Sequence, residues 1–243
     1  MIARNFSNIQ DIELTSSSKV TITKSSEFKV RVLGDDADKV EISQSGSTLT
    51  INDLSENQNS ILINGNNIII GNNNIVSGNF SYGDIYINGK KVNTSNFVEE
   101  DKNPVEIEIE CPDNLSLIAT LRGNASLTST PELNKVKIHG NGVCNVQVTA
   151  QSGKFKVSGS GDINYKSLGG NLNASISGSS EIRAIGKFSD IDASISGSGE
   201  LITEGEVKGD YDVSVSGSGT IRHQGMISGQ RSKSVSGCAL VYW

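Results

Sequence analysis

The most constraining feature of the sequence is a glycine that returns about every twenty residues through its second half. The text around the later glycines nearly repeats itself, as in SISGSSEI, SISGSGEL and SVSGSGTI. A fixed period near twenty is typical of chains that stack one small structural unit on another. The glycines that carry the period are Gly123, Gly140, Gly159, Gly178, Gly197, Gly217 and Gly237. The spacing therefore predicts a repeat architecture.

Apolar residues recur at fixed distances from these glycines. Positions two residues apart point to the same side of a strand, so each unit is predicted to be a strand, a small-residue corner and a second strand. Two residues before the glycines stand Leu121, Ile138, Val157, Ile176, Ile195, Val215 and Val235. Four residues after them stand Leu127, Cys144, Ile163, Ile182, Leu201, Ile221 and Val241. Four residues before them stand Ala119, Val136, Phe155, Ala174, Ala193 and Val213, with Lys233 as the departure. Stacked in register, these side chains would form one core that no single unit could bury alone.

These patterns predict an all-β fold, a parallel β-helix or solenoid with coils of about 19–20 residues. Hydrophobic residues make up 35% of the chain and aromatic residues 5%, which suits a narrow interior filled by aliphatic side chains. No segment sustains a 3.6-residue period, so we expect little or no helix.

The chain divides into three stretches of one structural domain. Residues 1–53 alternate between polar and apolar positions, which predicts irregular first coils that cap the solenoid. Residues 54–103 are rich in Asn and Gly, and Asn88-Gly89 between two alternating runs predicts a β-hairpin. We expect this stretch to be an insertion that projects from the coil; the alternative is that its Asn side chains stack as an internal amide ladder. Residues 104–243 hold the regular coils.

The charge, hydropathy and cysteine spacing of the chain limit its expected partners and location. The formal net charge of −6 argues against nucleic acid, which requires a basic stripe. No run of apolar residues is long enough to span a membrane. The N-terminus shows no signal peptide, so the chain as written is expected in the cytoplasm, and at the cell surface or secreted if a leader is missing. Cys111, Cys144 and Cys238 form no C-x-x-C pair, and Cys144 is expected in the core.

We expect no catalytic, cofactor or metal site. Acidic residues follow the corner in successive coils at Asp162, Glu181 and Glu200, and stacked acids could bind calcium or act as an acid–base pair. Because Arg183 and Arg222 stand close by in sequence, a solvated surface charge ladder is the favoured interpretation.

Other motifs are also interpreted as structural. The acidic run at residues 34–38 lacks the spacing of a calcium-binding EF-hand loop and is expected to be an exposed turn. The repeated G-S-G is followed by a strand rather than by the helix that a phosphate-binding loop needs. His139 and His223 occupy non-equivalent positions and are given no catalytic role.

Two ranks of serine flank the apolar position before each corner and are predicted to form an outward hydroxyl stripe. The candidate stripe comprises Ser175, Ser177, Ser194, Ser196, Ser214, Ser216, Ser234 and Ser236. Hydroxyl groups both donate and accept hydrogen bonds, so the stripe could contact sugars, ice or another protein. The alternative is that small residues are simply required beside a tight corner.

The chain ends in an apolar segment, Leu240, Val241, Tyr242 and Trp243. These residues could fold over the end of the coil as a lid, or pair with another subunit, because an open strand edge is a ready pairing surface. The second interpretation is favoured and predicts a homo-oligomer with this segment as its candidate interface.

Two segments carry a family resemblance. FSNIQDIELTSSSKVTITKSSEFKVRV and VEIEIECPDNLSLIATLRGNASL, with the repeated SVSGSG-type units, resemble bacterial GIN domains, described as "putative autotransporter adhesin" head domains. The resemblance covers most of residues 5–53 and 104–241. It implies a β-helix-like fold and an adhesive or surface role, and it brings no catalytic residues.

The leading hypothesis is therefore a non-enzymatic structural or binding module, adhesin-like, that presents a rigid solenoid surface to a protein or glycan partner. One alternative is a cytoplasmic scaffold whose coils stack end to end into oligomers or filaments. The other is a carbohydrate-active enzyme on a parallel β-helix, which fold analogy alone supports.

Overall fold

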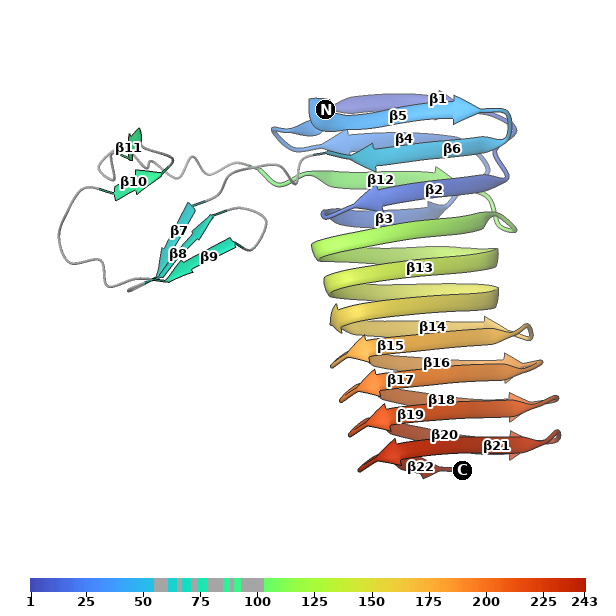
Figure 1. Ribbon diagram of the computed structural model, residues 1–243. Coiled ribbons are helices and arrows are strands. Elements are labelled where there is room, and N and C mark those ends of the chain that lie inside the picture. The colour runs from blue at the N-terminus through green and yellow to red at the C-terminus, as the bar shows by residue number, and fades with distance from the viewer. Residues whose placement is uncertain (55–60, 65–66, 71–73, 78–84, 88–89, 93–102) are drawn as a thin grey trace.

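In the computed structural model the strands of the main sheet stack in a single column, with the N-terminus at one end and the C-terminus at the other (Figure 1). The structure describes residues 1–54, 61–64, 67–70, 74–77, 85–87, 90–92 and 103–243. One sheet joins 17 strands, and the described residues contain no α-helix and a single 3₁₀ turn at Ala37–Lys39. The predicted all-β parallel solenoid is confirmed.

Each regular coil contributes two strands, and equivalent strands of successive coils pair in parallel. These strands are β14 (Asp162–Leu168), β15 (Leu172–Gly178), β16 (Glu181–Phe188), β17 (Ile191–Gly197), β18 (Glu200–Val207), β19 (Tyr211–Gly217), β20 (Thr220–Ile227), β21 (Arg231–Gly237) and β22 (Leu240–Tyr242). One ladder runs β15-β17-β19-β21 and the other β14-β16-β18-β20-β22. The long strand β13 (Ser116–Ser160) winds through the preceding coils and begins both ladders. We call the outward sides of these ladders the β15 face and the β16 face.

The core is the stack of alternate side chains that the repeat predicted. Ile176 pairs with Ile195 and Ile195 with Val215, and each is at most 2% exposed. On the other ladder Ile182, Leu201 and Ile221 are fully buried. The inner ladder of Ile176, Ile195 and Val215 becomes exposed to solvent only in the final coil.

There, Val235 is 44% exposed although it continues the inner ladder of Val215. The unit therefore depends on its neighbours for burial, as expected of a repeat fold.

The glycine corner is required by close backbone contact between coils. Gly178 and Gly197 have φ of +143° and +133°, and a Cβ added to Gly197 would lie 2.7 Å from the carbonyl oxygen of Gly178. The next residue, Ser198, donates its backbone N–H to the same oxygen at 3.0 Å. Because these N–H groups serve the neighbouring coil, the corner is a structural turn rather than an anion-binding loop.

The predicted glycine set needs one correction. Gly142, with φ of +105°, stacks between Gly123 and Gly159, whereas Gly140 lacks a positive φ. Gly140 occupies a buried inward position next to Val157, and the Sγ of Cys144 fills the space that a Cβ there would approach. Along the ladder, it is Val146 rather than Cys144 that pairs with Ile163. Because the coil from Gly142 to Gly159 has only 17 residues, the usual spacing of 19 residues before Gly159 falls on Gly140 instead.

A second glycine stack, which the sequence reasoning missed, runs along the β16 face. Gly186 pairs with Gly205 and Gly205 with Gly225, all at φ between +128° and +146°. A Cβ on Gly205 would lie 1.9 Å from the carbonyl oxygen of Gly186. No side chain fits there, so only glycine keeps the coils at their normal separation.

The N-terminal segment joins the same sheet but ends it with antiparallel strands. These elements are β1 (Ile2–Phe6), β2 (Asp11–Ser16), β3 (Lys19–Lys24), β4 (Phe28–Leu33), β5 (Val40–Ser45), β6 (Thr48–Asp53) and β12 (Glu106–Cys111). Strands β2 and β3 pair in parallel with β13, as coils should. Strand β4 pairs antiparallel with both β1 and β12, and β5 pairs antiparallel with β6. Strands β2 and β3 thus follow the parallel arrangement of the coils, while the end itself is closed by reversed strands.

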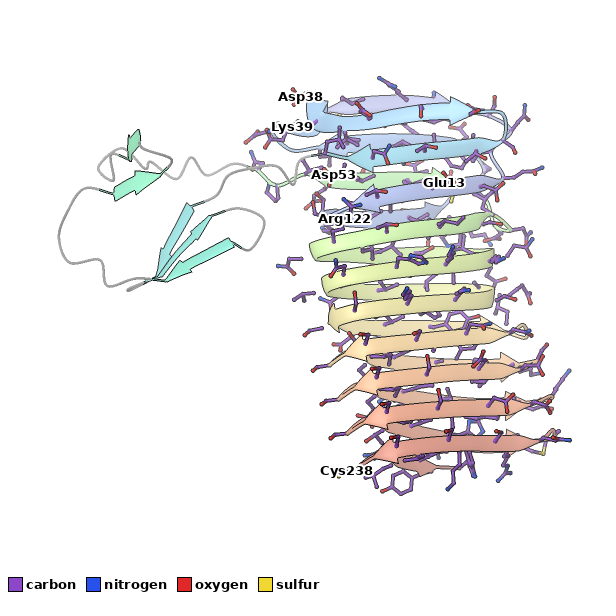
Figure 2. All side chains as sticks on the ribbon, in the orientation of Figure 1. Glu13, Asp38, Lys39, Asp53, Arg122 and Cys238 are labelled. Atoms are coloured by element: carbon purple, nitrogen blue, oxygen red, sulfur yellow. The ribbon has the colours of Figure 1, made fainter. Side chains whose placement is uncertain are left out.

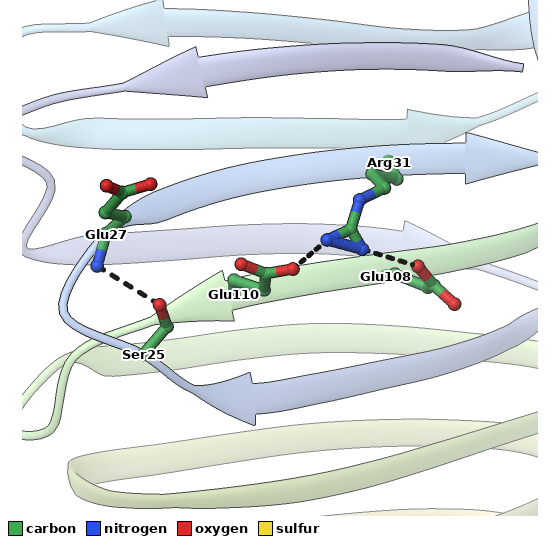
Figure 3. Close-up of polar contacts among 5 residues, drawn as sticks. All are labelled: Ser25, Glu27, Arg31, Glu108 and Glu110. Carbon is green, nitrogen blue, oxygen red and sulfur yellow. Dashed lines mark hydrogen bonds and ion pairs between the residues drawn. The ribbon is translucent and has the colours of Figure 1, made fainter.

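An ion-pair cluster ties the antiparallel strands β4 and β12 together (Figure 3). Arg31 lies opposite Glu108, and its Nη1 contacts Glu108 Oε2 at 3.1 Å while its Nη2 contacts Glu110 Oε1. The two carboxylates share one guanidinium group, whose forked donors suit such an arrangement.

The chain leaves the stack at Asp53 and re-enters it at Val105, both buried. Asp53 accepts hydrogen bonds from the hydroxyl groups of Ser16 and Ser18, at 3.1 and 2.6 Å. Between these points β7 (Ile61–Asn64), β8 (Asn67–Ile70) and β9 (Asn74–Ser77) form one antiparallel sheet. Strands β10 (Ile85–Ile87) and β11 (Lys90–Val92) form another, with Ile87 opposite Lys90 as the predicted hairpin requires. Asn88 and Gly89 lie outside the described residues, as do most of the Asn residues of the predicted amide ladder.

Candidate functional site

The serine stripe lies on the β15 face, with its members in register from coil to coil. Ser175 pairs with Ser194 and Ser194 with Ser214, and the second rank repeats this pattern. Ser194 and Ser175 are half-buried and their hydroxyl oxygens lie 3.2 Å apart. The other six serines are exposed. The hydroxyl groups therefore form two straight rows along this face.

The same face changes character along β13, where sequence reasoning predicted nothing. Lys137, Lys154 and Lys156 lie close to His139. Burial lowers the pKa of the His139 imidazole most, and the positive charges of these lysines lower it further. These lysines are visible in the sequence, but recognising that they lie together requires the 17-residue offset of this coil. The same offset pairs Val146 with Ile163.

The acidic residues after the corner are in register on the β16 face. Asp162 pairs with Glu181, and Glu181 with Glu200. Arg183 lies 2.9 Å from Glu204 and 3.8 Å from Glu181. These contacts match the interpretation of a surface charge ladder.

Arg222 adds a further contact at 3.1 Å from Glu200. Within the described ranges no three His, Cys, Asp or Glu side chains are grouped so that they could hold a metal ion.

His223 points into the core, close to the C-terminal end. Its Nδ1 lies 2.9 Å from Thr203 Oγ1, which lies 2.8 Å from the hydroxyl oxygen of Tyr211. Burial, with a smaller effect of Arg231, lowers the pKa of His223, and burial raises the pKa of Tyr211 to about 12. Thr203 is fully buried, so a substrate could not reach its hydroxyl group. The three side chains thus link β18, β19 and β20 within the core.

The three cysteines do not form a shared site. Cys111 and Cys144 are buried and Cys238 is exposed at the C-terminal end (Figure 2). Burial raises the pKa of Cys111 to about 12 and also raises that of Cys144, so both thiols stay protonated at neutral pH.

The acidic run near the N-terminus is a turn, as expected. Asp36 forms an ion pair with Lys39 at 3.0 Å, and Asp35 accepts the backbone N–H of Asn103 at 2.9 Å.

The apolar C-terminal segment is split between two directions. Val241 and Trp243 pack against the core, and the Trp243 ring meets that of Tyr211 at 5.7 Å, edge to face. Leu240 and Tyr242 point outward and are 49% and 51% exposed. The segment thus covers part of the last coil and leaves an apolar outer side.

Comparisons with known proteins identify a family and solved structures of similar fold. The family model described as "Putative auto-transporter adhesin, head GIN domain" matches residues 8–226. No curated protein matches the sequence. Within the described residues no helix is long and apolar enough to cross a membrane.

Solved structures share the fold at low sequence identity. A "putative adhesin" from Bacteroides fragilis has a TM-score of 0.60 at 18% identity, with 100% of this chain and 96% of that chain covered. A "putative adhesin" from Parabacteroides merdae has a TM-score of 0.54 at 14% identity, with 100% and 95% covered.

Proposed function

Because this chain belongs to the family of auto-transporter adhesin head GIN domains, we propose that it is a non-enzymatic, adhesin-like module that presents a rigid solenoid surface to a protein or glycan partner. The structures of similar fold from Bacteroides and Parabacteroides carry the description "putative adhesin". A solenoid with a filled aliphatic core offers its outer faces, rather than an internal cavity, to other molecules.

The observation that carries the proposal is the unbroken register of the β15 face. Its outward side chains are held in straight rows because each strand pairs with the next without a shift, from Asn173–Asp192–Asp212 to the serine rows. A surface whose polar groups are already fixed loses little conformational freedom on binding. The serine stripe is the part of this surface that we assign to the partner.

Adhesion of protein-coated beads to panels of immobilised glycans and matrix proteins tests the proposal. Ser214→Glu places a carboxylate on the β15 face, and Gln224→Glu makes a similar change at an exposed position of the β16 face. We expect Ser214→Glu to reduce adhesion at least tenfold and Gln224→Glu to leave it within twofold. Equal effects would remove the β15 face from the mechanism, and beads that adhere to no surface would reject the proposal.

A second candidate, a self-assembling scaffold or homo-oligomer, is favoured by the exposed apolar side chains of the last coil. Val235, Leu240 and Tyr242 are between 44% and 51% exposed there, beside the edge of β21 that no further strand of the described chain covers. Deleting residues 239–243 and measuring mass by light scattering tests it. A monomer from an oligomeric parent supports this interface, whereas a parent that is already monomeric rules it out.

A further inference from the structure

A cluster of positive charge stands on the β15 face where two successive turns of β13 run side by side. We call Lys135, Lys137, Lys154 and Lys156 the lysine patch. An offset of 17 residues between these two turns places them together. It is seen at two points, because Val146 pairs with Ile163 and Gly142 contacts Gly159. Lys137 therefore lies beside Lys154, and His139 beside Lys156, as the effect of these charges on the imidazole also shows. Neighbouring rows in a sheet are about 4.8 Å apart, so the ammonium groups repel one another.

Among the described residues no ion pair joins the lysine patch to a carboxylate. The ion pairs of the described residues are made by other cations, such as Lys19, Arg31 and Arg183. Charges are screened over about 8 Å at physiological ionic strength, so the local cluster rather than the net charge of −6 decides what approaches it. Uncompensated like charges held together by the fold are destabilising, and a bound anion would relieve the repulsion.

The patch also borders a hollow of a size suited to a ligand. The hollow has a volume of about 620 Å³ and is lined, among others, by Asn134, Lys135, Ser152, Lys154, Asn171 and Asn173. Ligand sites commonly span about 300–1,000 Å³. Amide and hydroxyl side chains beside the lysines can donate to and accept from the hydroxyl groups of a sugar. The lining therefore combines anion binding with sugar-type hydrogen bonding.

We propose that the lysine patch and its hollow bind an acidic polysaccharide, one that carries carboxylate or sulfate groups on its sugars. This inference rests on the proposed function: Lys156 pairs with Ser175, so the lysine patch adjoins the serine stripe on the β15 face and names the ligand class of that binding module. Lysine ammonium groups bind such anions as point charges.

Acidic rows on either side limit what the patch accepts. Glu13 of β2 lies opposite Ile118, on the side of the N-terminal coils (Figure 2). Asp192 lies opposite Asn173, on the side of the C-terminal coils. Double-stranded DNA carries a charge about every 1.7 Å along its axis and would meet these carboxylates if it ran along the column. An acidic polysaccharide carries its charges at sugar spacing, with hydroxyl groups between them, and so fits the shorter cationic area.

The test measures binding of the full chain to immobilised heparin, a sulfated polysaccharide, by biolayer interferometry at 50 and 150 mM NaCl. The double variant Lys137→Ser/Lys154→Ser removes two charges from the patch. Lys187→Ser/Lys208→Ser removes two exposed lysines elsewhere and has the same net charge. We expect the patch variant to bind at least tenfold more weakly and the control within twofold of the parent, with circular dichroism confirming that both variants fold.

Equal losses in the two variants would overturn the proposal, because only net charge would then matter. Single-stranded DNA or polyphosphate bound as tightly as heparin would overturn the choice of a polysaccharide. A parent that binds neither heparin nor polygalacturonate, yet adheres to a neutral glycan or a protein surface, refutes the lysine patch and leaves the proposed function standing. A parent that binds heparin through the patch while its coated beads adhere to no surface supports the patch and refutes the adhesive role.

Discussion

Replacing Gly205 with alanine should destabilise the solenoid far more than the same replacement at Gly169. Both residues have nearly the same backbone angle, with φ of +128° and +133°. A Cβ at Gly169 would meet nothing within 4 Å, whereas at Gly205 it would lie 1.9 Å from the carbonyl oxygen of Gly186. The pair therefore separates the backbone strain of a positive φ from the steric cost of stacking.

The expected losses in the free energy of unfolding follow from these contacts. A non-glycine residue in such a conformation costs about 1–3 kcal/mol, and the restricted unfolded chain returns about 0.4–1 kcal/mol. We expect Gly169→Ala to cost about 1–2 kcal/mol. In Gly205→Ala the coils must also move apart, and each buried backbone hydrogen bond left unmade costs about 1–3 kcal/mol. With two such bonds lost between β16 and β18, the total is about 3–8 kcal/mol.

Urea unfolding at 25 °C, followed by far-ultraviolet circular dichroism, measures both changes through the transition midpoint. Amide hydrogen exchange adds a local readout, since Gly205→Ala should expose the amides of β16 and β18 first. Similar losses in the two variants would refute the reasoning, because backbone strain alone would then explain the glycine stack.

Three further expectations concern other parts of the chain. Ile195→Asp should lower the thermal midpoint strongly because it buries an unpaired charge, while Ser194→Asp on the outer face should be tolerated; equal midpoints would contradict the register. His223 has a lowered pKa when folded, so its stabilisation is complete above its unfolded pKa of about 6.5 and is lost as the pH falls toward the folded value; urea midpoints between pH 7.5 and 5 should fall less in His223→Gln than in the parent, and parallel curves would count against this. Replacing residues 56–100 with a short Gly/Ser linker should keep a cooperative β-rich transition, and loss of folding would place that segment in the core.

The inner ladders were predictable because burial in a stacked coil leaves a period-2 pattern that survives in every unit. The register was less so, since only the structure shows that Gly142 and not Gly140 forms the corner. The second glycine stack was visible as Gly186, Gly205 and Gly225, but a lone glycine per coil has no distinctive flanking text. Alternation does not encode strand direction, so the antiparallel N-terminal end could not be predicted from residues 1–53.

The candidate surfaces divide in the same way. The serine stripe follows from alternation within one strand and was predicted with its outward direction. The lysine patch depends on which residues of different coils lie side by side, so the 17-residue coil concealed Lys137 beside Lys154. The inward position of His223 was predictable, since it stands two residues after the buried Ile221, although its contact with Thr203 required the fold.

Because the coils stack in register, the length of the column can change only by whole coils. Leu172 is fully buried and pairs with Ile191, and a slip of one residue at such a position would turn the core outward. The turns between the ladders are less constrained, because two residues separate Phe188 from Ile191. In the next coil, three residues separate Val207 from Tyr211. The turns therefore absorb changes in length that the strands cannot.

Removing or duplicating one complete coil would shorten or lengthen the column by about 4.8 Å and leave every remaining row aligned. The distance between a surface feature and the end of the column can thus change in fixed steps, without redesign of the interior.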